Sequence, residues 1–367
     1  MQWNEEFVGF LGEGTFGCVN LVRYFNPNDN EGSSYLSAVK SSYEVDYDNL
    51  QSELQILLEL RGYPNIVTCF GDSLEERFSR LGEKLYRLQL EYASEGSLSA
   101  FMDKYADRKL PEPLIKDFTW MILQGLVSVH GHGYVHCDIK PENLLVFPSS
   151  ATSSYEIKIA DFGNALEVGE VPKFWRSEVP WMGTAIYMSP ESVRDGVADM
   201  SLDLWSVGCL VLEMYTGVTP WEGVDLDLLA TRLRCGEAPE IPESLPSDAK
   251  DFIQTCFSRE PEERGSASEL LSHPFLSLPE VDVEEEKKTE DETRNSFLSK
   301  LFKLGIKRRS SKKKPTTDAG SVSDQEPLKL RFCKTKATQY KRTLNKVLRL
   351  KFMPLKKSNY FRLVSVH

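Results

Sequence analysis

The hydrophobic pattern of the chain changes near Gly96, from short β-prone runs to longer helical ones. Before this point one window differs, because the apolar residues 50, 54, 57 and 58 recur at helical spacing within Leu50–Leu60. The β-prone runs, which turn residues separate, are Phe7–Phe10, Cys18–Arg23, Tyr35–Lys40, Ile66–Phe70 and Tyr86–Tyr92. The first part of the chain therefore predicts a small sheet with one helix.

After Gly96 the pattern is mainly that of amphipathic helices with a 3.6-residue period. The helical segments are Pro113–Gly131, Ser201–Gly217, Asp225–Cys235 and Ser247–Phe257. Two β-prone pieces, Leu144–Phe147 and Glu156–Ala160, interrupt them. We therefore predict an α+β fold in two parts within residues 4–276, a small β-rich one over about 4–92 and a larger α-rich one over about 96–276.

The globular pattern ends at Leu276, and the composition beyond it is charged and of low complexity. Residues 277–367 hold 23 lysine and arginine residues against 11 acidic ones, a net charge of +12, which leaves −23 for residues 1–276. Such a composition predicts a largely disordered tail. The acidic body excludes nucleic acid as a partner, because nucleic-acid binding needs a basic face.

Two segments of the tail could form basic amphipathic helices. Ser296–Arg309 places three apolar residues on one helical face beside lysines, and Lys341–Phe352 has apolar residues at i, i+4 and i+8. Helices of this kind fit calmodulin, an anionic membrane surface or the acidic body of the chain itself. A solvated, disordered tail is the alternative. The basic run Lys307–Lys314 is a candidate nuclear import signal, although such runs often serve solubility alone.

The location of the protein can be inferred from features that the sequence lacks. The N-terminus has neither the basic nor the apolar region of a secretory signal, and no apolar run reaches the ~18 residues that cross a bilayer. The seven cysteines are odd in number and form no CxxC pair, which favours reduced thiols over disulfides or a zinc site. We therefore expect a cytoplasmic protein, with nuclear import as a further option.

A glycine-rich stretch joins the first two predicted strands. It consists of Gly12, Glu13, Gly14, Thr15, Phe16 and Gly17, with Val19 shortly after. The next predicted element is a strand, so the helix that a dinucleotide-binding Rossmann motif requires is missing. Glycine lets the backbone approach phosphate oxygens because it has no Cβ. Taken alone, the stretch fits an ordinary hairpin equally well.

Lys40 closes the third predicted strand and is expected to place its ammonium at the inner face of the sheet. A buried lysine needs a carboxylate partner, because an unpaired buried charge is costly. Glu53 is the best candidate partner, since it lies beside the apolar stripe of the predicted helix. Taken singly, each of the two residues also fits a solvated position.

Two short motifs carry groups suited to phosphoryl transfer. They are His136-Cys137-Asp138-Ile139-Lys140-Pro141-Glu142-Asn143 and Asp161-Phe162-Gly163. Asp138 can accept the proton of a substrate hydroxyl, and Lys140 can neutralise a γ-phosphate. Asn143 and Asp161 offer oxygen ligands for Mg²⁺.

These motifs, in this order, resemble the signature of the protein kinases. The glycine-rich loop, the strand lysine, the HxDxKPxN and DFG motifs and Ser189-Pro190-Glu191 match it across about residues 7–276. The resemblance implies the bilobal kinase fold, with ATP and Mg²⁺ as cofactors and transfer of the γ-phosphate of ATP to a protein.

The resemblance also implies roles for residues outside the catalytic motifs. The residues that would enclose the adenine are Leu11, Val19, Ala38 and Leu145. Those at the hinge, whose backbone would meet the adenine, are Glu91 and Ala93, next to the gatekeeper Leu90. Those with structural roles are Asp203 as the anchor of the catalytic loop, Glu191 and Arg264 as an ion pair, and His136 and Phe162 in the hydrophobic spine.

Finer resemblances concern the kind of kinase. Lys140 and Gly183-Thr184 resemble serine/threonine kinases, in which Thr184 would hydrogen-bond near Asp138 and shape the acceptor site. The stretch Gly183–Ser192 looks like the MAP kinase kinase kinase group, closest to its plant MEKK-like branch, which implies a signalling cascade with MAP kinase kinases as substrates. A serine/threonine kinase of a related group outside that cascade is the alternative, as is a kinase-fold scaffold with weak activity.

Three positions depart from the family pattern. Cys137 stands where an arginine is usual, Asn164 follows DFG where leucine is common, and Gly265 follows Arg264. None removes a catalytic group. The usual arginine neutralises a phosphate on the activation loop. We therefore expect activity without phosphate at the candidate activation-loop sites, Ser177 and Thr184.

Overall fold

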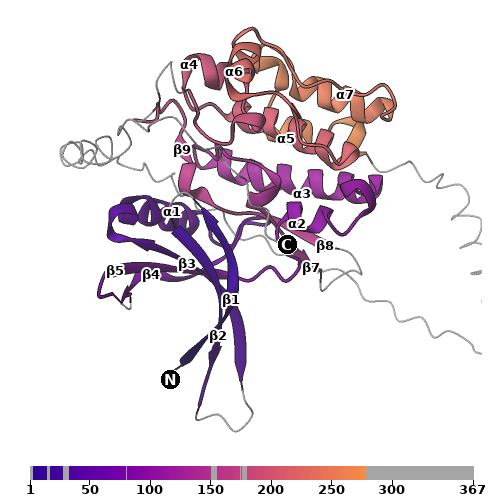
Figure 1. The fold of residues 1–367 in the computed structure, drawn as a ribbon. Coiled ribbons are helices and arrows are strands. Elements are labelled where there is room, and N and C mark those ends of the chain that lie inside the picture. The colour runs from indigo at the N-terminus through magenta and orange to yellow at the C-terminus, as the bar shows by residue number, and fades with distance from the viewer. Residues whose placement is uncertain are drawn as a thin grey trace, which may run out of the picture. The chain divides into compact units, whose positions relative to one another are not determined.

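The fold is described from a computed structural model, which covers residues 3–277 except for 15–16, 28–32, 80, 150–154, 174 and 176–179. The described residues all belong to one compact unit. Figure 1 shows strands β1 to β5 gathered on one side of this unit and most of its helices on the other. The predicted tail helices, the candidate import signal, Thr15, Phe16 and Ser177 all lie outside the described residues.

An antiparallel sheet of five strands forms the β-rich part, in the order β1-β2-β3-β5-β4. Its strands are β1 Asn4–Gly14, β2 Gly17–Phe25, β3 Ser34–Tyr43, β4 Cys69–Phe78 and β5 Lys84–Glu91. Each is longer than the apolar run that predicted it, because polar residues continue the pairing beyond the run, as where Glu75 lies opposite Arg87.

The predicted start of the fourth strand at Ile66 is wrong, since β4 begins at Cys69. Ile66 makes a single parallel bridge to Ile159, and the Val67 N–H donates to the Ile159 carbonyl at 2.9 Å. Ile66 and Val67 are both buried. These two residues are therefore apolar because they pack between the β-rich and α-rich parts, and not because they lie in a strand.

The one predicted helix of the β-rich part is confirmed as α1, Tyr47–Glu59. It packs against β4 and β5 and buries Leu50, Leu54 and Leu57 on one face. Glu53 lies on the same buried face, so its carboxylate is directed toward the sheet.

The α-rich part contains the four predicted helices, displaced by at most one residue at each end. They are α3 Glu112–Gly131, α5 Met200–Thr216, α6 Leu226–Arg234 and α7 Ser247–Cys256. Three short helices that the pattern did not predict are α2 Leu98–Met102, α4 Pro190–Asp195 and α8 Ala267–Leu270. They have too few turns to show a period.

Helix α5 is the centre of the α-rich part, because every residue from Ser201 to Met214 is buried. The Asp199 side chain caps its first turn, and Gly217 ends it in the left-handed conformation, with φ 72°. A helix that is buried on all sides provides a rigid support for the loops that contact it.

Two small antiparallel sheets of two strands each hold the chemical motifs. One pairs β7 Leu144–Pro148 with β8 Tyr155–Ile159, and the other pairs β6 Tyr134–Val135 with β9 Leu166–Glu167. The segment 136–143 runs from β6 to β7, and the segment 160–165 runs from β8 to β9. The two motif segments therefore lie next to each other between paired strands.

Two further properties of the described residues bear on the expectations from sequence. The six described cysteines are free thiols. None of the helices in the described part of the chain is long and apolar enough to cross a membrane.

Candidate active site

Lys40 lies on β3 and pairs with Glu53 of α1, as predicted. Its Nζ donates to Glu53 Oε2 at 2.6 Å and to Asp161 Oδ1 at 2.7 Å. The side chains of Lys40 and Glu53 are only 10% and 2% exposed. Burial opposes the charge of Lys40, but the two carboxylates outweigh it, so the pKa of Lys40 is raised. The ammonium group is therefore charged at neutral pH.

Asp161 was not foreseen as a partner of Lys40, since 121 residues separate them in sequence. It has a left-handed backbone, with φ 62°, and its side chain is 41% exposed. Burial raises its pKa, but the Lys40 ammonium outweighs that effect, so the pKa of Asp161 is lowered. An ionised carboxylate thus faces both Lys40 and the open side of the site.

Phe162 fixes the DFG motif against the catalytic loop. Its buried ring lies 5.0 Å from the His136 ring, edge to face. A ring nitrogen of His136, Nε2, lies 3.0 Å from the Ala160 carbonyl oxygen. The two residues that the resemblance places in the hydrophobic spine thus pack against each other.

Asp138 is surrounded by hydrogen-bond donors. Its Oδ1 accepts from the Thr184 N–H at 2.9 Å and from the Thr184 hydroxyl at 2.7 Å. Its Oδ2 lies 2.9 Å from Lys140 Nζ. Burial raises the pKa of Asp138, but Lys140 and the hydrogen bonds outweigh it, so the pKa is lowered. The carboxylate is ionised and can accept a proton only transiently, as a base in phosphoryl transfer should.

Asp203 anchors the catalytic loop from the first turn of α5, as predicted. Its carboxylate accepts the backbone N–H groups of His136 and Cys137, each at 2.9 Å. The ring Nε2 of His130 lies 2.9 Å from the same carboxylate. Cys137 has a left-handed backbone, with φ 64°, and the two hydrogen bonds around it stabilise this conformation. The loop therefore presents Asp138 on a fixed backbone.

Asn143 is oriented for a role as a metal ligand. Its Nδ2 donates to the Asp138 carbonyl at 2.8 Å and to Asp138 Oδ2 at 3.0 Å. Its amide oxygen is thereby left for a ligand, as is the open side of Asp161. No cluster of three or more acidic, histidine or cysteine side chains suited to a metal is found among the described residues. An amide and a carboxylate nevertheless suit Mg²⁺, which proteins hold with few side chains together with phosphates.

The glycines of the glycine-rich stretch, at the end of β1 and the start of β2, differ in what they require. A Cβ added to Gly12 or Gly14 of β1 would meet no atom within 4 Å, so space is open around this end of β1. A Cβ on Gly17 would lie 2.1 Å from the Ser41 carbonyl oxygen, and the φ of Gly17 is 147°. Gly17 is therefore needed for the sheet itself, whereas Gly12 and Gly14 leave room for a ligand.

Three of the four residues expected around an adenine lie on the adjoining strands β1, β2 and β3, and the fourth lies on β7. Val19 pairs with Gly12 of β1 and with Lys40 of β3, and Ala38 lies on β3 beside β2. Leu11 is 44% exposed at the end of β1, and Leu145 on β7 bridges to the segment after the hinge. Three of these residues thus share the β1–β3 side of the five-stranded sheet, and Leu145 comes from the α-rich part.

The hinge residue Glu91 has a second role that its sequence motif did not indicate. Its N–H donates to the Thr68 carbonyl at 2.9 Å, and its Oε2 accepts from Lys158 Nζ at 2.9 Å. The Thr68 N–H donates to Glu91 Oε1 at 2.6 Å. Glu91 is thus fixed between Thr68, just before β4, and Lys158 of β8, while Leu90 and Ala93 beside it are buried.

The activation segment, residues 161–191, returns to the catalytic loop at Gly183. A Cβ on Gly183 would lie 2.2 Å from the Cys137 carbonyl oxygen, so only glycine allows this approach. The next residue, Thr184, accepts a hydrogen bond from Lys140 Nζ at 2.7 Å while it donates to Asp138. The predicted position of Thr184 beside Asp138 is confirmed.

The predicted ion pair between Glu191 and Arg264 is also present. The Arg264 Nη2 donates to Glu191 Oε2 at 2.9 Å, and the Arg264 side chain is fully buried. Ser189 caps the helix α4 that carries Glu191. The end of the activation segment is therefore fixed to the α-rich part.

Asn164 is a residue near the base whose role the sequence did not reveal. Its Nδ2 donates to Asp138 Oδ2 at 3.4 Å. Only its departure from the usual leucine after DFG marked it in the sequence. The fold brings it close because η4, Phe162–Asn164, lies directly after Asp161.

Comparison with known proteins agrees with this geometry. A model of the protein kinase domain matches residues 6–276. Mitogen-activated protein kinase kinase kinase 20 of Arabidopsis thaliana is 37% identical over 308 residues, which cover 82% of this chain and 83% of that protein. Mitogen-activated protein kinase kinase kinase 17 of the same plant is 35% identical, over 77% of this chain and 72% of that protein.

A more distant relative comes from yeast. The serine/threonine-protein kinase BCK1/SLK1/SSP31 of Saccharomyces cerevisiae is 32% identical over 84% of this chain but only 20% of its own length. The match thus spans about a fifth of that protein's length. Because the protein kinase domain model matches residues 6–276 and the plant relatives are similar over most of their length, the chain belongs to the protein kinase family. It is a serine/threonine kinase of the mitogen-activated protein kinase kinase kinase group.

Proposed function

We propose that this chain transfers the γ-phosphate of ATP to serine or threonine residues of MAP kinase kinases, as a MAP kinase kinase kinase in a signalling cascade. The observation that carries the proposal is the assembly of Lys40, Glu53 and Asp161 next to the donor-rich base Asp138. A scaffold that had lost catalysis would not need this costly arrangement of buried charges.

The residues present fit ATP with a divalent metal, which the protein kinase family uses. Gly12 and Gly14 leave space for phosphates, Lys40 is a charged donor, and Asn143 and Asp161 offer oxygens for Mg²⁺. When bound, ATP supplies the phosphoryl group, and the metal neutralises the charge that develops on it.

The side chains of the protein would remove a proton from the acceptor and neutralise negative charge on the transferring phosphoryl group. Asp138 would take the proton of the acceptor hydroxyl, and Lys140, 2.9 Å from it, would balance the negative charge of the transferring group. Thr184 holds both Asp138 and Lys140, which fixes their relative position. Phosphoryl transfer asks for little more than such positioning and electrostatic stabilisation.

The substrate class and the location are supported less directly. The names of the plant relatives place those proteins above MAP kinase kinases in a cascade, and this chain shares about a third of their residues. A cytoplasmic location remains a prediction from sequence. The contact of the tail with calmodulin or an anionic membrane is also a prediction, on residues outside the described part.

A phosphorylation assay tests the proposal. Purified full-length protein is incubated with ATP, Mg²⁺ and a panel of inactivated MAP kinase kinases, with an unrelated serine-rich protein as control. We expect phosphoserine or phosphothreonine on the activation segment of at least one MAP kinase kinase, identified by mass spectrometry. Transfer to the unrelated protein alone would contradict the cascade assignment, and no transfer at all would contradict the activity.

A further inference from the structure

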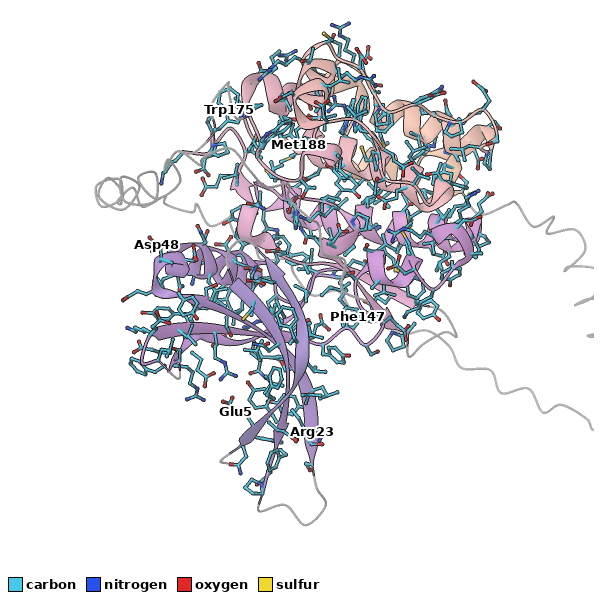
Figure 2. The ribbon with its side chains drawn as sticks, in the orientation of Figure 1. Glu5, Arg23, Asp48, Phe147, Trp175 and Met188 are labelled. Atoms are coloured by element: carbon cyan, nitrogen blue, oxygen red, sulfur yellow. The ribbon has the colours of Figure 1, made fainter. Side chains whose placement is uncertain are left out.

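Trp175 is an aromatic residue of the activation segment with no part in the chemistry described above. Its N–H donates to the Pro172 carbonyl at 3.0 Å, and its indole is partly buried against the hydrophobic core. Figure 2 shows Trp175 beside α4, the helix at the end of the same segment. Its contacts with the end of α4 suggest a role in holding the activation segment.

Trp175 packs on Gly196, the residue that ends α4. Gly196 has the left-handed conformation of a helix C-cap, with φ 66° and ψ 18°. A Cβ added to Gly196 would lie 2.3 Å from Trp175 Cε2, 2.4 Å from Cδ2 and 2.6 Å from Nε1. The indole therefore lies directly over the Gly196 backbone, and any side chain there would displace it.

Backbone hydrogen bonds fix the same stretch of chain to the residues after α4. The Gly169 N–H donates to the Ala198 carbonyl, and the Ala198 N–H donates to the Glu170 carbonyl, both at 2.8 Å. Helix α4 is itself fixed by the buried ion pair with Arg264. Gly169, Glu170 and Trp175 of the activation segment are thus attached to the end of α4 and the residues after it by two hydrogen bonds and one large aromatic contact.

The residue next to the base offers no charge to a phosphate. Cys137 carries a thiol where a guanidinium would attract a phosphorylated segment, and its burial raises the pKa of that thiol. A phosphate on the activation segment would thus find fewer charge-assisted hydrogen bonds near Asp138. The packing of Trp175 on Gly196 buries apolar surface and needs no modification to form.

We propose that Trp175 is a positioning residue whose packing on Gly196 holds the activation segment in place for the protein acceptor without a phosphate. This inference rests on the proposed function and adds to it a means by which the acceptor side of the site is kept in order. The chain from Gly196 leads back through α4 to Thr184, which contacts Asp138. The ATP side, built on Lys40 and Glu53, is expected to be independent of it.

Steady-state kinetics of the full-length, phosphatase-treated protein test this division. Trp175→Ala is expected to lower kcat/KM for a MAP kinase kinase acceptor by about tenfold or more, while KM for ATP stays within about twofold. Trp175→Phe, which keeps an aromatic ring, should recover most of the loss. Gly196→Val disrupts the same contact by adding a side chain beneath the indole, and its kinetic constants should resemble those of Trp175→Ala. Trp120→Ala, at a residue of α3 that is 45% exposed, is the matched control.

Hydrogen exchange provides a second readout that does not depend on activity. Trp175→Ala should speed exchange at the Gly169 and Ala198 amides and leave the amides of α3 unchanged. Unchanged kinetics and exchange would overturn the proposal, as would equal losses toward acceptor and ATP. If the wild-type protein transferred no phosphate at all, the proposed function would fail, and exchange at Gly169 and Ala198 would still decide the role of Trp175.

Discussion

Replacing Lys40 with methionine removes the charge at the centre of the site and keeps most of the side-chain volume. The variant loses two short charge-assisted hydrogen bonds, at 2.6 Å to Glu53 and 2.7 Å to Asp161. It also leaves Glu53, whose side chain is 2% exposed, without its cation. Because burial already raises the pKa of Glu53, we expect this carboxyl group to take up a proton in the variant.

The size of the effect follows from these contacts. A hydrogen bond to a charged group is worth about 1.5–3 kcal/mol, and about 1.4 kcal/mol corresponds to a tenfold change in rate. Loss of one such bond predicts a fall in kcat/KM of about one to two orders of magnitude, so loss of both bonds of Lys40 predicts a fall of about two orders of magnitude or more. The effect on the free energy of unfolding should stay below the 3–5 kcal/mol of a broken buried pair, since protonation of Glu53 relieves part of it.

Phosphate transfer to a protein acceptor and thermal unfolding measure the two effects separately. Lys84→Met, at a partly exposed lysine of β5 paired with Glu76, is the matched control and should change neither. Glu53→Gln should also lower phosphate transfer. The double variant should transfer little less phosphate than Lys40→Met alone, because both substitutions act on one ion pair. Retention of more than about a tenth of wild-type transfer by Lys40→Met would refute the assignment of Lys40.

Three further predictions test other parts of the account. Gly17→Ala should lower Tm because its Cβ would meet the Ser41 carbonyl, whereas Gly12→Ala should leave Tm of the nucleotide-free protein unchanged; equal Tm values for both variants would contradict this. Burial raises the pKa of Glu213, so its contribution to stability is present at acid pH and lost as pH rises through that pKa; Glu213→Gln should remove this pH dependence from the unfolding curve, and an unchanged curve would disprove it. Dephosphorylated wild-type enzyme, checked by mass spectrometry, should remain substantially active because of Cys137, and a drop above about tenfold would refute that expectation.

The predictions that came from sequence alone were strongest where a motif fixed both residue type and order. Lys40, Asp138 and Asn143 could be assigned because the chemistry they carry tolerates few other residues. The partner of Lys40 in α1 was also predictable, since the helical period placed Glu53 on the buried face.

Contacts between distant segments could not be read from the chain. The hydrogen bonds of Lys158 to Glu91, and of Asn164 to Asp138, join residues 67 and 26 positions apart. The short strands β6 and β9 have two residues each, too few to show alternation. The fourth strand was wrongly predicted to begin at Ile66, because residues buried between two parts of a protein give the same apolar run as a strand.

The central claim is that Asp138 acts on the acceptor and not on the nucleotide. Asp138→Asn keeps the shape of the side chain and can keep its hydrogen bond with Thr184, but it is no longer a base. Calorimetry of ATP·Mg²⁺ binding and single-turnover transfer to a MAP kinase kinase should be measured on the same preparation. The account predicts a Kd for ATP within about twofold of wild type and transfer reduced by about two orders of magnitude or more. Transfer above about a tenth of the wild-type rate would contradict it.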